Sequence, residues 1–128
     1  MSFEPVLREL MERAPEARGA IFCDGEGESI DLVLARPPPS GCGELSDYDL
    51  KVAGAQVAAS WLNLHNGSVQ RGAGEALEMR LRCDAGTLLC RVLREGYYLV
   101  LLLAPGARGA APAAFALREA ADRVRADL

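Results

Sequence analysis

Apolar side chains recur every three or four positions in three segments of the 128-residue chain, a spacing that predicts helices with one buried face. The expected helices are residues 3–14, 47–65 and 112–128. Pro15 should end the first helix and Asn66-Gly67 the second. Pro112 can start the third helix, because a residue in the first turn needs no partner for its N–H.

Five other segments show the alternation or the short apolar run that is typical of strands. The expected strands are residues 19–24, 29–35, 75–83, 87–93 and 97–103. The connecting turns are expected at Asp24-Gly25-Glu26-Gly27, at 84–86 and at 94–96. The order is therefore α-β-β-α-β-β-β-α, an α/β sandwich that we expect to form one domain over residues 1–128.

The segment 75–83 alternates strictly between apolar and charged residues. Its apolar side carries Leu77, Met79, Leu81 and Cys83. Its charged side carries Glu78, Arg80 and Arg82. Such a strand has one face in water, as antiparallel sheets allow. Because the two strands that follow are more apolar, this one should lie nearer the sheet edge.

The second helix is unusual because it carries no charged residue from Val52 to Gln70. At 100° per residue its larger apolar residues share one face, which should pack on the sheet: Leu50, Val57, Trp61 and Leu64. A second, smaller-residue face holds Val52, Ala55, Ala59 and Leu62. One sheet covers only one face, so we expect the second face to form a dimer contact. The alternative is that other helices of the same chain cover it.

The connector 36–46 contains three consecutive prolines, which forbid a helix and favour an extended segment. It is interpreted as a stiff surface loop, and a docking ligand for a proline-binding domain is the alternative.

Composition and charge remove several classes of function. The net charge of −4 is unlike that of a nucleic-acid binder. The four cysteines lack the paired spacing of a zinc site and are expected to be free thiols in a reducing cytoplasm. The longest apolar run, 97–104, is too short to cross a membrane, and the first residues do not resemble a signal peptide. We therefore expect a cytoplasmic protein without a metal, a nucleic-acid partner or a membrane partner.

The sequence also lacks the motifs that are typical of an active site. The single histidine, His65, falls at a helix end without a candidate nucleophile nearby in sequence. The glycine-containing segments 41–43 and 72–74 lack the Lys and Ser/Thr of a phosphate loop. We therefore expect no catalytic residue and no cofactor.

The chain resembles the roadblock/dynein light chain family, in the type that regulates small GTPases of prokaryotes. The likeness rests on three features in this order: the segment Arg18-Gly19-Ala20-Ile21-Phe22-Cys23-Asp24-Gly25-Glu26-Gly27, the long apolar central helix, and the closing strand Glu95-Gly96-Tyr97-Tyr98-Leu99-Val100. The resemblance implies a roadblock/profilin-like fold, with a five-stranded antiparallel sheet flanked by helices. It also implies a homodimer through the central helix and the adjoining edge strand. The Pro-rich connector departs from the family's pattern.

The expected function is that of a non-catalytic, homodimeric adaptor or regulator. The resemblance implies that it acts with a Ras-like small GTPase system, in bacterial cell polarity or motility, by binding the GTPase or another roadblock-type protein. The expected dimer residues are Val52, Ala55, Ala59, Leu62, Leu77 and Met79. The expected partner-binding residues are Phe22, Asp24, Glu26, Glu78, Arg80 and Arg82. The alternative is a sensory α/β domain that holds a small ligand in a pocket.

Overall fold

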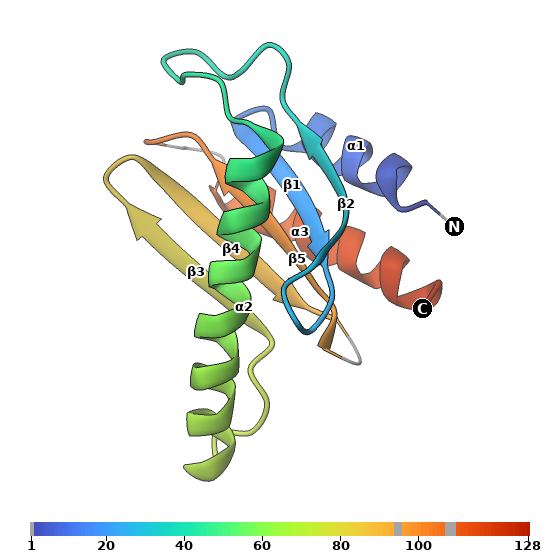
Figure 1. Ribbon diagram of the computed structural model, residues 1–128, viewed down its shortest axis with the longest axis vertical. Coiled ribbons are helices and arrows are strands. Elements are labelled where there is room, and N and C mark those ends of the chain that lie inside the picture. Colours follow the sequence, from blue (N-terminus) through green and yellow to red (C-terminus); the bar gives the residue numbers. More distant parts are fainter. Residues whose placement is uncertain (1, 94–95, 107–109) are drawn as a thin grey trace.

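The computed structural model describes residues 2–93, 96–106 and 110–128, and its element order is the one expected. The elements are α1 (Glu4–Arg13), β1 (Ala17–Cys23), β2 (Ser29–Leu34), α2 (Asp47–Gln70), β3 (Glu78–Cys83), β4 (Gly86–Val92), β5 (Tyr98–Leu103) and α3 (Ala110–Ala126) (Figure 1). Most boundaries fall within a few residues of the expected ones. The expected turn at 94–96 lies partly outside the described residues, as does the loop before α3. No described helix combines the length and the apolar character that crossing a membrane requires.

The five strands form one antiparallel sheet in the order β2-β1-β5-β4-β3. The most apolar strand, β5, occupies the middle and is almost entirely buried. The alternating strand β3 lies at one edge, which confirms the position expected from its pattern. Most of its six residues are exposed, because only β4 pairs with it.

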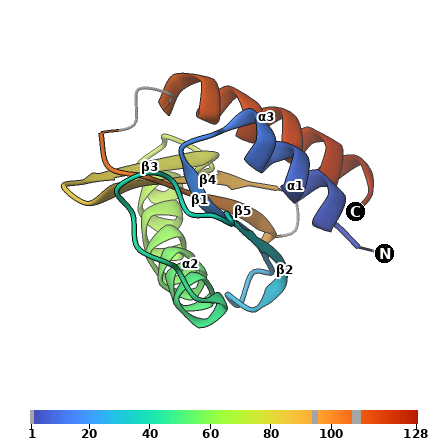
Figure 2. The ribbon, with the colours of Figure 1, turned by 90° about the horizontal axis from the view of Figure 1, so that it is seen from above.

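Helices cover the two faces of the sheet unequally. Figure 2 shows α1 and α3 together on one face and α2 alone on the other. The larger core lies under α1 and α3, and it includes Phe22, whose ring contacts that of Phe3 with centroids 4.8 Å apart. Phe22 is fully buried, so the structure corrects its expected place on a partner surface. Both faces of β1 are covered, which agrees with the unbroken apolar run at residues 20–23.

The central helix is longer than expected. A capping box between Ser46 and Asp49 begins it, and Asn66-Gly67 does not end it. The helix continues to Gln70, and the left-handed residue after it is Gly72, with φ of +81°. The hydroxyl of Ser68 donates to the backbone carbonyls of His65 and Gly74, and these hydrogen bonds lie beyond the expected helix end at Gly67. The last turns of α2 therefore extend beyond the sheet (Figure 1).

Candidate interaction surface

The face of the sheet under α2 is only half covered. Five strands at about 4.8 Å spacing make a sheet about 20 Å wide, whereas one helix is about 10 Å across. The helix packs on β1 and β2, at the far side from β3. It approaches the sheet closely at Gly54, where an added Cβ would lie 2.9 Å from Cys23 Sγ and 3.4 Å from Ile21 Cδ1. This tight contact holds α2 over one half of the sheet and leaves the β3 half open.

The open half is an apolar groove of about 460 Å³ between α2 and β3. Its walls are Ala53, Gln56, Val57, Ser60 and Leu64 from α2, and Met79, Arg80, Leu81, Leu88 and Cys90 from the strands. Leu64 is 58% exposed and Leu81 is 57% exposed, although both are large apolar side chains. Leu77, just before β3, is 56% exposed. A contiguous apolar surface of this kind marks a place where another molecule binds.

The buried and exposed residues of α2 in the structure differ in part from those that the helical pattern predicts. Leu50 and Val57 are buried against the sheet, as expected, but Leu64 is not. Ala59 is exposed and lies three residues after Gln56, so it is a neighbour of the groove residues on the outer side of the helix. Val52 is partly buried and shares that side of the helix, four residues before Gln56.

The other two expected helix residues, Ala55 and Leu62, turn away from the groove. Ala55 adjoins the β1–β2 turn, where a Cβ on Gly27 would come within 3.1 Å of the Ala55 Cα. Leu62 is 53% exposed. The expected strand residues, Leu77 and Met79, lie on the α2 side of the sheet. The open surface therefore extends from β3 across the outer side of α2.

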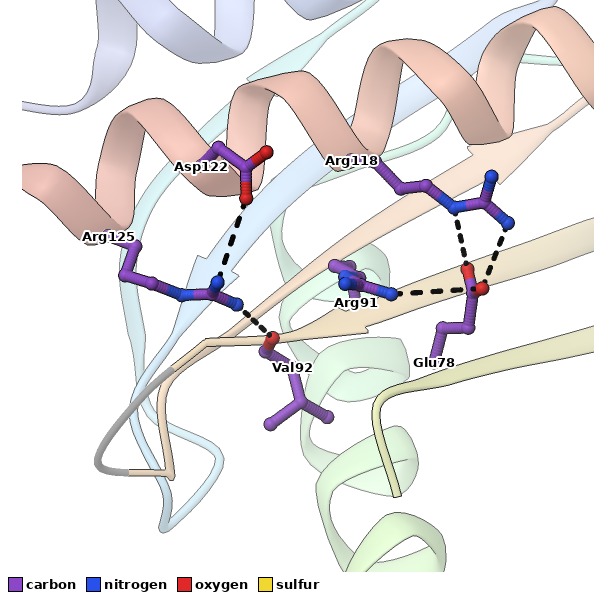
Figure 3. Close-up of polar contacts among 6 residues, drawn as sticks. All are labelled: Glu78, Arg91, Val92, Arg118, Asp122 and Arg125. Carbon is purple, nitrogen blue, oxygen red and sulfur yellow. Dashed lines mark hydrogen bonds and ion pairs between the residues drawn. The ribbon is translucent and has the colours of Figure 1, made fainter. Parts of the chain in front are cut away.

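The charged side of β3 faces the layer of α1 and α3. Glu78 accepts hydrogen bonds from Arg118 of α3 at 2.9 and 3.3 Å, and Arg91 of β4 lies 3.7 Å away (Figure 3). The hydrogen bonds from Arg118 are the main cause that lowers the pKa of Glu78. Arg80 and Arg82 are exposed. The sheet edge thus combines an apolar side toward α2 with a mainly cationic side toward α3.

The first hairpin presents less charge than expected. The carboxylate of Asp24 accepts from the N–H groups of Glu26 and Glu28, at 2.9 and 3.0 Å. This Asx-type arrangement fixes the turn, so Asp24 has a structural role there. Glu26 is exposed and remains available to a partner.

Two features beside the groove were not foreseen from the sequence. The ring of His65 stacks on Trp61 with centroids 4.8 Å apart, and its Nδ1 accepts from the N–H of Ala76 at 3.3 Å. Residues four apart on a helix are neighbours, so the spacing of Trp61 and His65 is the signal that could have indicated the stack. The bond to Ala76 joins segments eleven residues apart and has no such signal.

Metal-ligand clusters and thiol reactivity can be assessed for the described residues. No three His, Cys, Asp or Glu side chains within the described ranges gather as a metal ion would require. Cys23 and Cys90 lie in the core beneath α2, where burial raises their thiol pKa values to about 11 and about 12. A thiol with so high a pKa is a poor nucleophile at neutral pH.

Solved structures of roadblock proteins share this fold. A Roadblock/LC7 domain from Streptomyces avermitilis is 15% identical, with a TM-score of 0.76 over 95% of this chain and 93% of that chain. An MglB with a tetrameric arrangement is 18% identical, with a TM-score of 0.82 over 97% and 85%. The gliding protein MglB from Thermus thermophilus is 20% identical, with a TM-score of 0.69 over 94% and 89%.

No family model matches the sequence, and no curated protein matches it either. The similarity therefore lies in the fold. It is the roadblock/LC7 fold, with the five-stranded antiparallel sheet between helices that the sequence resemblance implied.

Proposed function

We propose that this chain is a homodimeric, non-catalytic adaptor or regulator of the roadblock type. It acts in the cytoplasm with a Ras-like small GTPase system, and it binds either the GTPase or another roadblock-type protein. The observation that carries the proposal is the open apolar surface of α2 and β3, with Leu64, Leu77 and Leu81 more than half exposed. Apolar surface of this extent is costly to leave in water, so a protein partner covers it.

The proposed dimer contact contains the six residues expected from the sequence together with the groove. These residues are Val52, Ala55, Ala59, Leu62, Leu77 and Met79, with Leu64 and Leu81 added. Small residues at the outer side of α2 allow a second helix to approach closely. The similar MglB with a tetrameric arrangement favours self-association.

The charged surfaces that a dimer leaves free are the proposed contacts with the GTPase or with a second roadblock protein. These surfaces hold Glu26 at the first hairpin and Arg80 and Arg82 beside Glu78 on β3. The protein acts by ordering the switch segments of the GTPase and does not supply an arginine to the transition state. The similar gliding protein MglB favours a role in cell polarity or movement.

The proposal is tested by measuring the oligomeric mass of the protein, its binding to partners and its effect on GTP hydrolysis. Light scattering should give twice the chain mass, and affinity capture from native cytoplasm should recover a small GTPase or a roadblock-type protein. GTP hydrolysis by the recovered GTPase is then measured with and without this protein. Reversal of charge at Arg80 and Arg82 should weaken the contact more at low salt than at high salt, whereas reversal at Arg36, in the connector, should not.

Several results would contradict the proposal. If the protein is monomeric at high micromolar concentration, the proposed homodimer is wrong. If it does not bind either class of partner measurably, the proposed adaptor function is wrong. A small molecule retained in native mass spectrometry would instead favour a ligand-sensing domain.

A further inference from the structure

A second groove lies on the α3 side of the sheet, along the charged side of β3. Glu78 stands opposite Arg91 of β4, and Arg80 stands opposite Leu89. Residues directly opposite one another share a face of the sheet, and Leu89 belongs to the core under α1 and α3. Arg82 lies on the same face, two residues after Arg80. Because α3 packs mainly on β4 and β5, a groove of about 290 Å³ stays open between β3 and α3.

Arginines from three elements surround this groove. Arg80 of β3 and Arg118 of α3 line it, and Arg82 follows along β3. Arg91 of β4 is only 19% exposed, and its buried Nε has no hydrogen-bond partner among the described residues. Glu78 supplies a carboxylate to the groove, but Arg118 and Arg91 already share it (Figure 3). The groove therefore carries an excess of positive charge, although the whole chain carries a net charge of −4.

Arg80 and Arg82 differ from the arginines of the neighbouring helices. Within the part of the chain that the structure describes, neither of their side chains forms an ion pair, and Asp84 in the turn after β3 pairs with neither. Both arginines are exposed, so their charges remain available to a partner. The helical arginines, in contrast, have carboxylates of their own layer: Arg13 pairs with Glu119, Arg123 with Glu9, and Arg125 with Asp122.

We infer that this groove binds a short, extended acidic segment of a protein partner, in which carboxylate side chains alternate with apolar ones. The inference rests on the proposed function, since it assigns a partner element to Arg80 and Arg82. Residues two apart on a strand are separated by about 6.5 Å, which is also the spacing of alternate carboxylates in an extended segment. An arginine can hold a carboxylate through two parallel N–H donors, so each of the two arginines can take one carboxylate of the segment.

The lining of the groove favours a peptide over a nucleic acid. Leu89, Ala114 and Leu117 form an apolar part of the wall, where the apolar side chains of the segment can pack. A phosphate backbone has no apolar group to place there. A long polyanion would also meet the rest of a surface whose net charge is negative, whereas a short segment contacts the groove alone.

Binding is tested by fluorescence anisotropy with the purified protein and a labelled peptide of alternating aspartate and leucine. A control peptide has asparagine in place of aspartate. The aspartate peptide should bind at least about tenfold more tightly than the asparagine peptide, and the difference should shrink at high salt. Arg80→Gln and Arg82→Gln should each weaken binding of the aspartate peptide about two- to fivefold. Arg36→Gln, at an exposed arginine of the connector, is the matched control and should not weaken it.

Glu78→Gln should change the affinity in the opposite direction. The change removes the carboxylate that competes with the peptide for Arg118 and Arg91, so the aspartate peptide should bind about two- to fivefold more tightly. Leu81→Ser alters the other face of the sheet, in the groove beside α2, and should leave the affinity for the peptide unchanged. Thermal melts establish that each variant is folded before its affinity is compared.

Several outcomes would overturn the inference. These are equal affinity for the two peptides, equal effects of Arg80→Gln and Arg36→Gln, weaker binding by Glu78→Gln, and tighter binding of a single-stranded RNA oligomer of the same charge. Loss of the peptide in Leu81→Ser would place it in the groove beside α2 instead. If a small GTPase or a roadblock-type protein binds but the aspartate peptide does not, the inference is wrong and the proposed function stands. If the peptide binds but neither class of partner does, the proposed function is wrong.

Discussion

Replacement of Leu81 by serine should separate association from folding. Leu81 projects from β3 into the groove and is 57% exposed in a single copy. Because so much of the side chain is already in water, Leu81→Ser should cost a single copy only about 1 kcal/mol of unfolding free energy. The dimer should lose considerably more, since the exposed part is what a partner would cover.

The magnitude follows from the exposed fraction. Full burial of a leucine side chain stabilises by about 1.5–3 kcal/mol, so covering the remaining 57% contributes about 0.9–1.7 kcal/mol. A two-fold dimer contains the contact twice, which gives about 1.7–3.4 kcal/mol. Each 1.4 kcal/mol changes a dissociation constant by about tenfold. Leu81→Ser should therefore raise the dimer dissociation constant by about 15- to 300-fold.

Sedimentation velocity over a dilution series measures this constant, with thermal melting as a check of folding. Phe115→Ser is the matched control, because Phe115 is 55% exposed but lies on α3, on the other side of the sheet. An unchanged dissociation constant for Leu81→Ser, or an equal loss for Phe115→Ser, would refute the assignment of the groove as a dimer surface.

Three further predictions test the surface and the core. Ala59→Arg should convert the dimer to monomer in light scattering, because it sets a charge against the proposed helix contact; a dimer of unchanged affinity would exclude this side of α2. Gly54→Ala should lower the unfolding free energy by about 1 kcal/mol in denaturant titration, as the crowding against Cys23 Sγ exceeds the gain in helix propensity, and Cys23→Ala should reverse the loss. The free energy of unfolding should fall as the pH rises above about 9, because the thiols ionise there only in the unfolded chain. In the folded protein, burial raises the pKa of Cys23 to about 11 and that of Cys90 to about 12. An unfolding free energy that stays constant up to about pH 11 would contradict this.

The order of elements and the character of each strand could be predicted from local patterns in the sequence. Periods of 3.6 and 2 are local properties, so they identified three helices and five strands without knowledge of their packing. The same kind of pattern placed β3 nearer an edge, because the two strands that follow it in sequence are more apolar. The charged residues Glu78, Arg80 and Arg82 and the apolar Leu77 and Met79 were likewise assigned to opposite faces correctly.

Which side of α2 stays open depends on how the helix packs on the sheet, and the helical pattern did not predict it. The helical pattern placed Leu64 with the buried residues, yet the close approach at Gly54 shifts α2 over β1 and β2 and leaves Leu64 in the groove. Both faces of β1 are covered, which buries Phe22, and the unbroken apolar run at residues 20–23 is the signal that could have indicated it. A helix's own sequence fixes which residues share a face, but the width of the sheet and the contacts of distant strands determine how much of that face is covered.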